Sequence, residues 1–318
     1  STDLRVIGGS FPTYVVDSLV ELDGSVTADL KLGPEGVTGT VTNGTSMDLR
    51  DCVWAVNSYP FPVGGLAPGE QVEVELSDKT LKPRGEFSPE AMMGKRGRTR
   101  KQLVQSLFTP AKDRTYSPWA QRLFLLGWPR RHFVSENLEG VDREVTKRSI
   151  SLLSAEADVE KAEPGTKVHI PRAFSTCMVR PATSKSSFGA LEFFKKAMPP
   201  VSELELYMPE FASNVELDRA TLHMVCSAFG NEMIVRGVDQ KTGEAVELTR
   251  LKNPDGRVRA EIPDAGRFQD RSRGVVVVQI AVQPLEQALE EPAQSRTFAL
   301  GGGWQLEDVT ISLEGTAR

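Results

Sequence analysis

The chain has 318 residues, with 38 basic and 43 acidic side chains and a formal net charge of −5. A hydrophobic fraction of 39% beside 25% charged residues is typical of globular proteins, which excludes disordered and collagen-like classes. The length predicts about two domains. The longest useful apolar run, residues 275–282, has the length of a strand, so we expect no membrane span. The opening Ser-Thr-Asp gives no sign of a signal peptide.

The net charge conceals an uneven distribution. Residues 82–131 contain twelve Lys and Arg against three acidic side chains, a net charge of +9, so the rest of the chain carries −14. The segment therefore carries a net charge opposite in sign to that of the rest of the chain.

Residues 1–82 show short strand patterns separated by turn residues. The strands are predicted at 13–22, 25–32, 37–41, 49–56 and 71–76, and the prolines and glycines of residues 60–65 predict a loop. Strands at this spacing indicate an antiparallel sandwich rather than a parallel sheet with crossover helices.

One stretch of this unit resembles a known pattern. Residues 39–51 read Gly-Thr-Val-Thr-Asn-Gly-Thr-Ser-Met-Asp-Leu-Arg-Asp, and residues 65–70 read Gly-Leu-Ala-Pro-Gly-Glu. Together they resemble bacterial extracytoplasmic immunoglobulin-like modules, in which Asn and Gly make turns and the Leu66 position plugs the end of the sandwich. The resemblance implies an N-terminal Ig-like β-sandwich (1–82) in the envelope part of a membrane-anchored or secreted protein. It carries no catalytic residues.

Residues 83–130 are predicted to form a basic helical connector. Ser88 and Pro89 are typical of a helix start, residues 101–108 place apolar side chains on one face, and Ser117-Pro118 opens a further helix through Leu126.

Strand patterns return in residues 131–318. They lie at 149–157, 167–170, 175–180, 203–208, 221–229, 232–238, 245–251, 257–262, 274–283 and 304–313. So many strands suit a jelly-roll or related sandwich. Residues 215–224 and 304–310 are similar to jelly-roll modules of bacterial surface proteins, so the expected fold is mainly β, with a jelly-roll-like β-sandwich as its C-terminal unit.

The motifs tested predict no catalytic, cofactor or metal site. Cys52, Cys177 and Cys226 form no C-x-x-C unit, and the three histidines lack metal-ligand spacing. Residues 241–243 read Lys-Thr-Gly but lie between two strand patterns, which favours a hairpin turn. An active site built from carboxylates on neighbouring strands stays open, since sequence spacing does not reveal it.

The basic run of the connector has three interpretations. Lys95, Arg96, Arg98, Arg100 and Lys101 can form a solvated loop, contact an anionic surface such as lipid headgroups or an acidic envelope polymer, or bind nucleic acid. Nucleic acid is the least favoured partner, because no aromatic side chains interleave with the cations and the remaining −14 would repel DNA.

The sequence therefore predicts a non-catalytic extracytoplasmic domain of a bacterial membrane-anchored protein, either periplasmic or at the cell surface. We expect a structural or binding role towards a protein or an envelope polymer, with membrane segments outside residues 1–318. The alternative is a carbohydrate-binding or carbohydrate-acting protein that uses the C-terminal sandwich. Exposed aromatic side chains on a sheet face, such as Trp304 or Tyr207, would support it.

Overall fold

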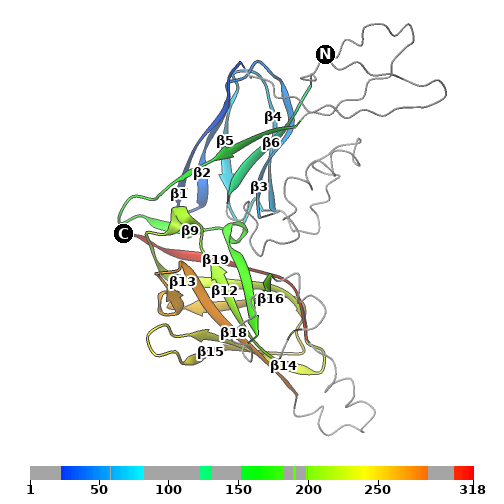
Figure 1. The fold of residues 1–318 in the computed structure, drawn as a ribbon, viewed down its shortest axis with the longest axis vertical. Helices are drawn as coiled ribbons and strands as arrows, with labels where there is room; N and C mark the ends of the chain where they lie inside the picture. The colour runs from blue at the N-terminus through cyan, green and yellow to red at the C-terminus, as the bar shows by residue number, and fades with distance from the viewer. Residues whose placement is uncertain are drawn as a thin grey trace, which may run out of the picture.

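The fold, shown in Figure 1, is mainly β. The computed structural model describes residues 23–57, 59–81, 122–130, 152–181, 189–190, 198, 200–285 and 304–318. Within these residues the helical elements are three short 3₁₀ turns: η2 (Arg172–Phe174), η4 (Glu210–Ala212) and η5 (Ala265–Phe268). The strands form four sheets, arranged as an N-terminal and a C-terminal sheet pair.

Eight strands among the described residues build the N-terminal sheet pair. They are β1 (Val26–Gly33), β2 (Gly36–Asn43), β3 (Leu49–Val56), β4 (Tyr59–Leu66), β5 (Gln71–Leu76), β6 (Leu123–Pro129), β7 (Leu153–Ala157) and β8 (Val159–Glu160). One sheet has the order β5-β2-β1-β8 and the other β4-β3-β6-β7. All neighbours are antiparallel except β1 and β8. Segments on both sides of residues 82–121 thus complete the same two sheets.

The helix predicted through Leu126 is wrong where the structure describes it. Residues 123–129 form β6, which pairs with β3 on one side and β7 on the other. Every residue from Leu123 to Trp128 is buried, so the segment shows neither the alternation of a half-exposed strand nor the exposed face of a surface helix. The rest of the predicted connector, residues 83–121, lies outside the described residues.

The loop predicted at residues 60–65 is also wrong, because these residues form β4. Pro60 lies opposite Ala55 and Pro62 opposite Val53 in the register with β3. The strand is at the edge of its sheet, where a proline's missing N–H removes no hydrogen bond to a further strand.

The residues that carry the Ig-like resemblance form a buried hydrogen-bonded cluster that joins the end of β2 to the β2–β3 and β4–β5 connections. The Asn43 side chain, which is 0% exposed, donates from Nδ2 to the carbonyls of Met47, Leu66 and Ala67 at 2.7, 3.0 and 3.2 Å. Its Oδ1 accepts from the amide and the hydroxyl of Thr45 at 3.1 and 2.7 Å. Leu66 is also 0% exposed, as expected for a plug. These residues therefore stabilise the N-terminal sheet pair.

The C-terminal sheet pair contains the remaining strands. They are β9 (Lys167–Ile170), β10 (Thr176–Pro181), β11 (Gly189–Ala190), β12 (Val201–Tyr207), β13 (Val215–Ser227), β14 (Asn231–Val238), β15 (Ala245–Lys252), β16 (Asp255–Pro263), β17 (Gln269–Asp270), β18 (Val275–Pro284) and β19 (Gln305–Ala317). One sheet has the order β16-β13-β19-β9. The other has the order β11-β10-β12-β18-β14-β15, with β17 beside β18.

The two sheet pairs share one hydrophobic core. Phe174 of η2 is fully buried between Phe61 of β4, at 6.5 Å between ring centroids, and Phe211 of η4, at 5.2 Å. Polar contacts reinforce the junction: the Tyr59 hydroxyl donates to Asp308 at 2.8 Å, and Asn57 Nδ2 donates to the carbonyl of Ala173 at 2.9 Å. Because apolar packing and hydrogen bonds both cross the junction, the sheet pairs are held in a fixed relation.

Candidate functional site

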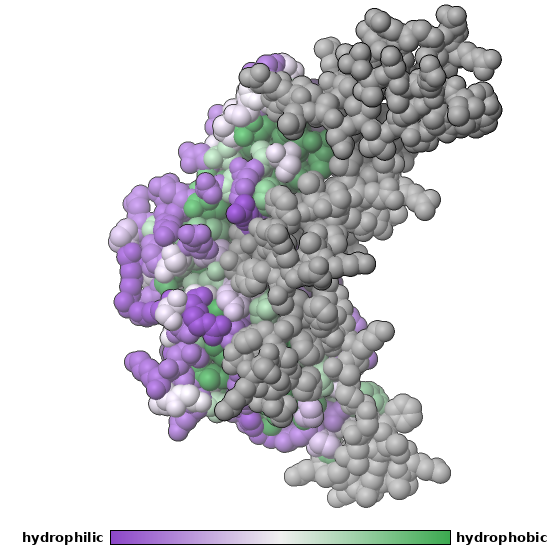
Figure 2. Space-filling view, viewed as in Figure 1, coloured by the Kyte–Doolittle hydropathy of each residue, from purple (hydrophilic) through white to green (hydrophobic). Residues whose placement is uncertain are grey.

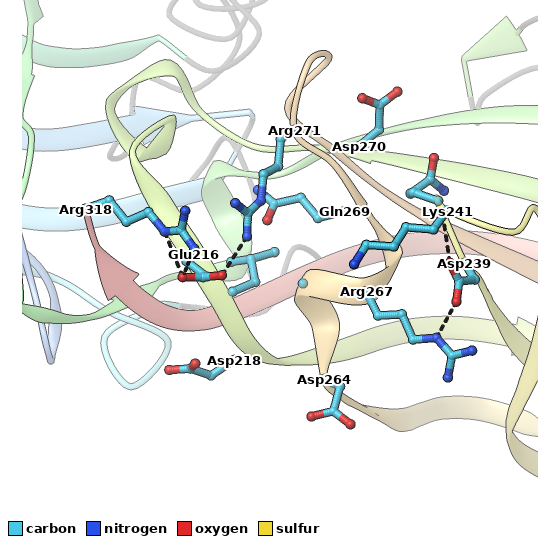
Figure 3. A pocket seen from close by; sticks show the side chains of 13 residues that line it. Glu216, Asp218, Asp239, Lys241, Asp264, Arg267, Gln269, Asp270, Arg271 and Arg318 are labelled. Carbon is cyan, nitrogen blue, oxygen red and sulfur yellow. Dashed lines mark hydrogen bonds and ion pairs between the residues drawn. The ribbon is translucent and has the colours of Figure 1, made fainter.

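A charged groove lies at the end of the C-terminal sheet pair where Arg318 lies (Figure 3). Its volume is about 1030 Å³. Four separate chain segments line it: the start of β13, the turn between β14 and β15, the loop around η5 and β17, and the residue after β19. The lining residues are Glu216, Leu217, Asp218, Asp239, Gln240, Lys241, Asp264, Gly266, Arg267, Gln269, Asp270, Arg271 and Arg318.

One wall of the groove is a carboxylate held by two guanidinium groups. Arg271 donates to Glu216 Oε1 at 2.7 Å, and Arg318 donates through Nε to Glu216 Oε2 at 2.7 Å. These hydrogen bonds, that of Arg318 above all, lower the pKa of Glu216. The lining as a whole has five carboxylates and four cations, so neighbouring carboxylates such as Asp218 and Asp270 offset these two guanidinium groups.

The opposite wall is a closed ion pair. Arg267 Nε lies 2.5 Å from Asp239 Oδ2, and only 6% of the Asp239 side chain is exposed. Asp239 also accepts the backbone N–H groups of Lys241 at 2.8 Å and Thr242 at 3.2 Å. The Arg267 hydrogen bond and then the Lys241 amide lower the pKa of Asp239. Asp239 therefore holds the backbone of the turn that contains Lys241 (Figure 3).

Gln269 places an unsatisfied acceptor at the base of the groove. Its side chain is buried, Nε2 donates to the Met208 sulfur at 3.3 Å, and Oε1 has no hydrogen-bond partner. A buried acceptor without a hydrogen bond lowers the stability of the fold by about 1–3 kcal/mol.

Two exposed charges of the groove are also unengaged. Within the described residues, neither the Lys241 ammonium nor the Asp264 carboxylate makes a side-chain hydrogen bond or ion pair. Asp264 stands at the N-cap of η5 with a φ of 52°, a left-handed conformation that aspartate adopts more readily than most residues. The groove thus offers one free cation and one free anion beside its paired walls.

A second charged cluster lies on the sheet that contains β12 and β18. Arg273 forks the buried carboxylate of Glu205 at 3.0 and 2.6 Å and also donates to the Tyr207 hydroxyl at 3.1 Å. The Glu205 hydrogen bond raises the pKa of Arg273. Burial first, and then the bond to Glu205, raises the pKa of Tyr207. A bidentate ion pair of this kind stabilises the fold, and its carboxylate is already bound by the arginine.

A smaller cavity, of about 470 Å³, lies where the sheet pairs meet. It is lined by residues 156–159, which end β7 and begin β8, by Glu210 and Phe211 of η4, and by Arg122, Leu123 and Lys161. Its exposed Arg122 pairs with Glu156 at 3.2 Å, and Lys161 donates to Ser213 at 3.1 Å. Both cations are already engaged, so the charged groove is the stronger candidate for ligand binding.

The predicted contact residues Lys95, Arg96, Arg98, Arg100 and Lys101 lie outside the described residues. The Lys241-Thr242-Gly243 tripeptide does lie in a turn, between β14 and β15, with Gly243 at a φ of 75°. Sequence reasoning stopped at that turn and missed the groove, since residues 216–218, 264–271 and 318 are far from it in the chain. The concentration of charge at 264–273 was the one available signal.

The three thiols are buried or partly buried and unpaired. Burial raises the pKa of Cys52 to about 12 and that of Cys226 to about 11, and it also raises the pKa of Cys177. All three thiols are therefore protonated near neutral pH. In the part of the chain that the structure describes, no group of three potential metal ligands is present.

The aromatic residues singled out for sugar stacking do not form an exposed platform. Trp304 is 2% exposed, and the Tyr207 hydroxyl is bonded to Glu205 and Arg273. The described surface visible in Figure 2 is mostly hydrophilic. Phe229, 82% exposed in the turn between β13 and β14, is the one exposed large apolar side chain among the residues described.

The comparisons with known proteins concern the N-terminal part. Residues 25–160 match the model of a family described as a domain of unknown function, DUF8725. The match ends at the last residue of β8, so it spans the N-terminal sheet pair. No curated protein matches the chain. Among the described residues no helix is long and apolar enough to cross a membrane.

Proposed function

We propose that this chain is a non-catalytic extracytoplasmic domain of a bacterial membrane-anchored protein, with a binding role at the cell envelope. In this proposal the N-terminal sheet pair is an Ig-like module that acts as a spacer. The C-terminal sheet pair is a jelly-roll-like module that presents the charged groove to an envelope polymer or protein.

The groove is the observation that carries the binding role. Its walls are held by ion pairs to Glu216 and Asp239, so its shape is set before a ligand arrives. Preorganised polar groups lose little conformational entropy on binding. The shared core at Phe174 adds a rigid link to the N-terminal sheet pair, which suits a spacer.

The chemistry of the described residues favours binding over catalysis. Burial raises the pKa of the cysteine thiols, and the buried carboxylates Glu205 and Asp239 are paired with arginines. A nucleophile or general acid needs the opposite condition, a depressed thiol pKa or a raised carboxyl pKa.

The basic residues Lys95, Arg96, Arg98, Arg100 and Lys101 enter the proposal as a contact to an anionic surface. Each cation near an anionic membrane surface contributes about 1 kcal/mol, so five of them would hold the chain against the envelope at low salt.

The experiment has two arms. Purified protein is sedimented with insoluble envelope polymer and with vesicles of anionic lipid, beside a variant that replaces the five cations with serine. Co-sedimentation of the wild-type protein supports the proposal, and its absence with both surfaces contradicts the binding role. Protease access to an epitope-tagged protein in intact or osmotically opened cells tests the location. Cleavage only after lysis of the inner membrane would contradict an extracytoplasmic domain.

A further inference from the structure

The sheet β4-β3-β6-β7 has an apolar outer face. Its inner face contains Trp54 and Leu125, which lie opposite each other and belong to the hydrophobic core. Their chain neighbours project to the other side of the sheet, because side chains alternate along a strand. Ala55 of β3 lies opposite both Phe124 of β6 and Pro60 of β4, so three strands share this side. The side chains of this apolar face are Val53, Ala55, Pro60, Phe124, Leu126 and Trp128.

The apolar face is buried, although it lies outside the core. Its five members other than proline are 1–8% exposed, and Pro60 is buried as well. None of its side chains belongs to the hydrophobic core that the described residues form. The outer face of the other sheet of the pair, β5-β2-β1-β8, instead presents exposed polar residues such as Asp29 and Glu73. Of the two outer faces, the apolar one therefore packs against a further layer.

Residues 101–108 carry the pattern that fits the apolar face. They place Leu103, Val104 and Leu107 on one side of the predicted helix and Gln102 on the other. Such a helix covers a sheet face well, because its apolar stripe lies across several strands. A further strand would not serve, since it pairs with the edge of a sheet and leaves the face open.

The place of residues 101–108 in the chain supports the same occupant. They lie between β5 and β6, and β6 contributes three of the six side chains of the apolar face. Residues 109–121 can extend over about 40 Å, so the chain is long enough to return from any part of the face to β6. The family match at 25–160 includes both the face and this segment, whereas the apolar residues 13–22 lie outside it.

We propose that residues 101–108, which lie outside the described residues, dock on the apolar face as an amphipathic helix of the same chain. Leu103, Val104 and Leu107 then supply the layer that buries the face. Because the basic run ends at Lys101, docking also holds Lys95 to Lys101 beside this sheet. This last consequence rests on the proposed function: it places the contact to an anionic surface on the β4-β3-β6-β7 side of the N-terminal sheet pair.

Photo-cross-linking in the whole chain tests the docking. p-Benzoylphenylalanine replaces Leu107 on the apolar side of the segment, or Gln102 on its polar side as the matched control. After irradiation, peptide mapping should join position 107 to peptides that contain residues 53–55 or 124–128 of the same chain, and position 102 to neither. Cross-links from position 107 to another part of the chain, or to a second copy, would overturn the proposal.

Hydroxyl-radical footprinting gives an independent reading of the apolar face. Leu107→Asp should raise the oxidation of Phe124 and Trp128 severalfold, while Trp54 in the core stays protected. Gln102→Asp adds the same charge on the polar side and should change none of the three. Unchanged oxidation of Phe124 and Trp128 in Leu107→Asp would count against the docking. If oxidation of Trp54 rises as well, the sheet pair has unfolded, and Leu107→Ser decides by the same comparison.

Sedimentation with anionic vesicles separates this inference from the proposed function. We expect the cross-link from position 107 and also vesicle binding that is lost when the five cations are replaced with serine. A cross-link to the apolar face without vesicle binding would uphold the docking and contradict the contact of the basic run with an anionic surface. Vesicle binding with a cross-link elsewhere would uphold that contact and overturn the docking.

Discussion

Replacing Asn43 tests whether the motif that resembles Ig-like modules acts through structure. Its side chain makes five hydrogen bonds at 0% exposure, three donated to carbonyls and two accepted from Thr45. A hydrogen bond contributes about 0.5–1.5 kcal/mol net, and the two Nδ2 hydrogens are shared among three carbonyls, so we take a value near the lower end of the sum. Asn43→Ala should therefore destabilise the N-terminal sheet pair by about 3 kcal/mol.

Asn43→Asp sharpens this prediction because it keeps the size of the side chain, removes its two donor hydrogens and adds a negative charge. The carboxylate keeps two acceptors for Thr45 but turns an anion towards the carbonyls of Met47, Leu66 and Ala67. It should be less stable than Asn43→Ala at neutral pH and should recover as the pH falls and the carboxyl takes up a proton.

Thermal unfolding followed by circular dichroism measures both variants. A loss of about 3 kcal/mol corresponds to a fall of about 6–12 °C in Tm for a unit of this size. Thr38→Ala, on the exposed face of neighbouring β2, is the control and should change stability by less than about 0.5 kcal/mol. A fall of under 2 °C for Asn43→Ala, or an Asn43→Asp variant that matches wild type, would refute the reasoning.

Three further predictions concern the core and its charges. Burial lowers the pKa of His223 to about 4 from 6.5, so the unfolded chain binds the proton first. The free energy of unfolding should therefore be highest above pH 6.5 and fall by about 2–3 kcal/mol towards pH 4. His223→Gln should flatten this part of the pH profile of Tm. An unchanged profile in that variant would show that His223 is not the cause. Phe174→Ala should cost about 3–5 kcal/mol and lower the calorimetric transitions of both sheet pairs, whereas a shift in one alone would disprove the shared core. Arg273→Ala should lower the free energy of unfolding in urea by about 2–3 kcal/mol, because it leaves the buried Glu205 carboxylate without its arginine. Adding Glu205→Gln should restore part of this loss. If the double variant is no more stable than Arg273→Ala, the buried charge is not the cause.

The strands that could be predicted from sequence are those bounded by turn residues. The expected strands at 49–56 and 71–76 coincide with β3 and β5, because turn residues bound both and β5 alternates exposed and partly buried positions. β6 was missed because Ser117-Pro118 is typical of a helix start, and the apolar run that follows was assigned to that helix. β4 was missed because its prolines signal a loop unless the strand is known to lie at an edge.

The charged groove could not be predicted for a different reason. Lys241 was recognised only as part of a turn, and the residues that face it come from segments 216–218, 264–271 and 318. Their approach depends on the order of β13, β14 and β19 in two different sheets. The unpaired state of Gln269 Oε1 depends in turn on the position of Met208, more than fifty residues away in the chain. The charge concentrated at 264–273 is visible in the sequence, but the segments that it faces are not.

Hydrogen–deuterium exchange of the whole chain with solubilised envelope polymer tests the central claim most directly. If the charged groove is the binding surface, the polymer should slow exchange of the backbone amides in segments 239–242 and 264–271 and leave those of β2 and β5 unchanged. Protection confined to the N-terminal sheet pair, or equal exchange with and without polymer at saturating concentration, would contradict the account.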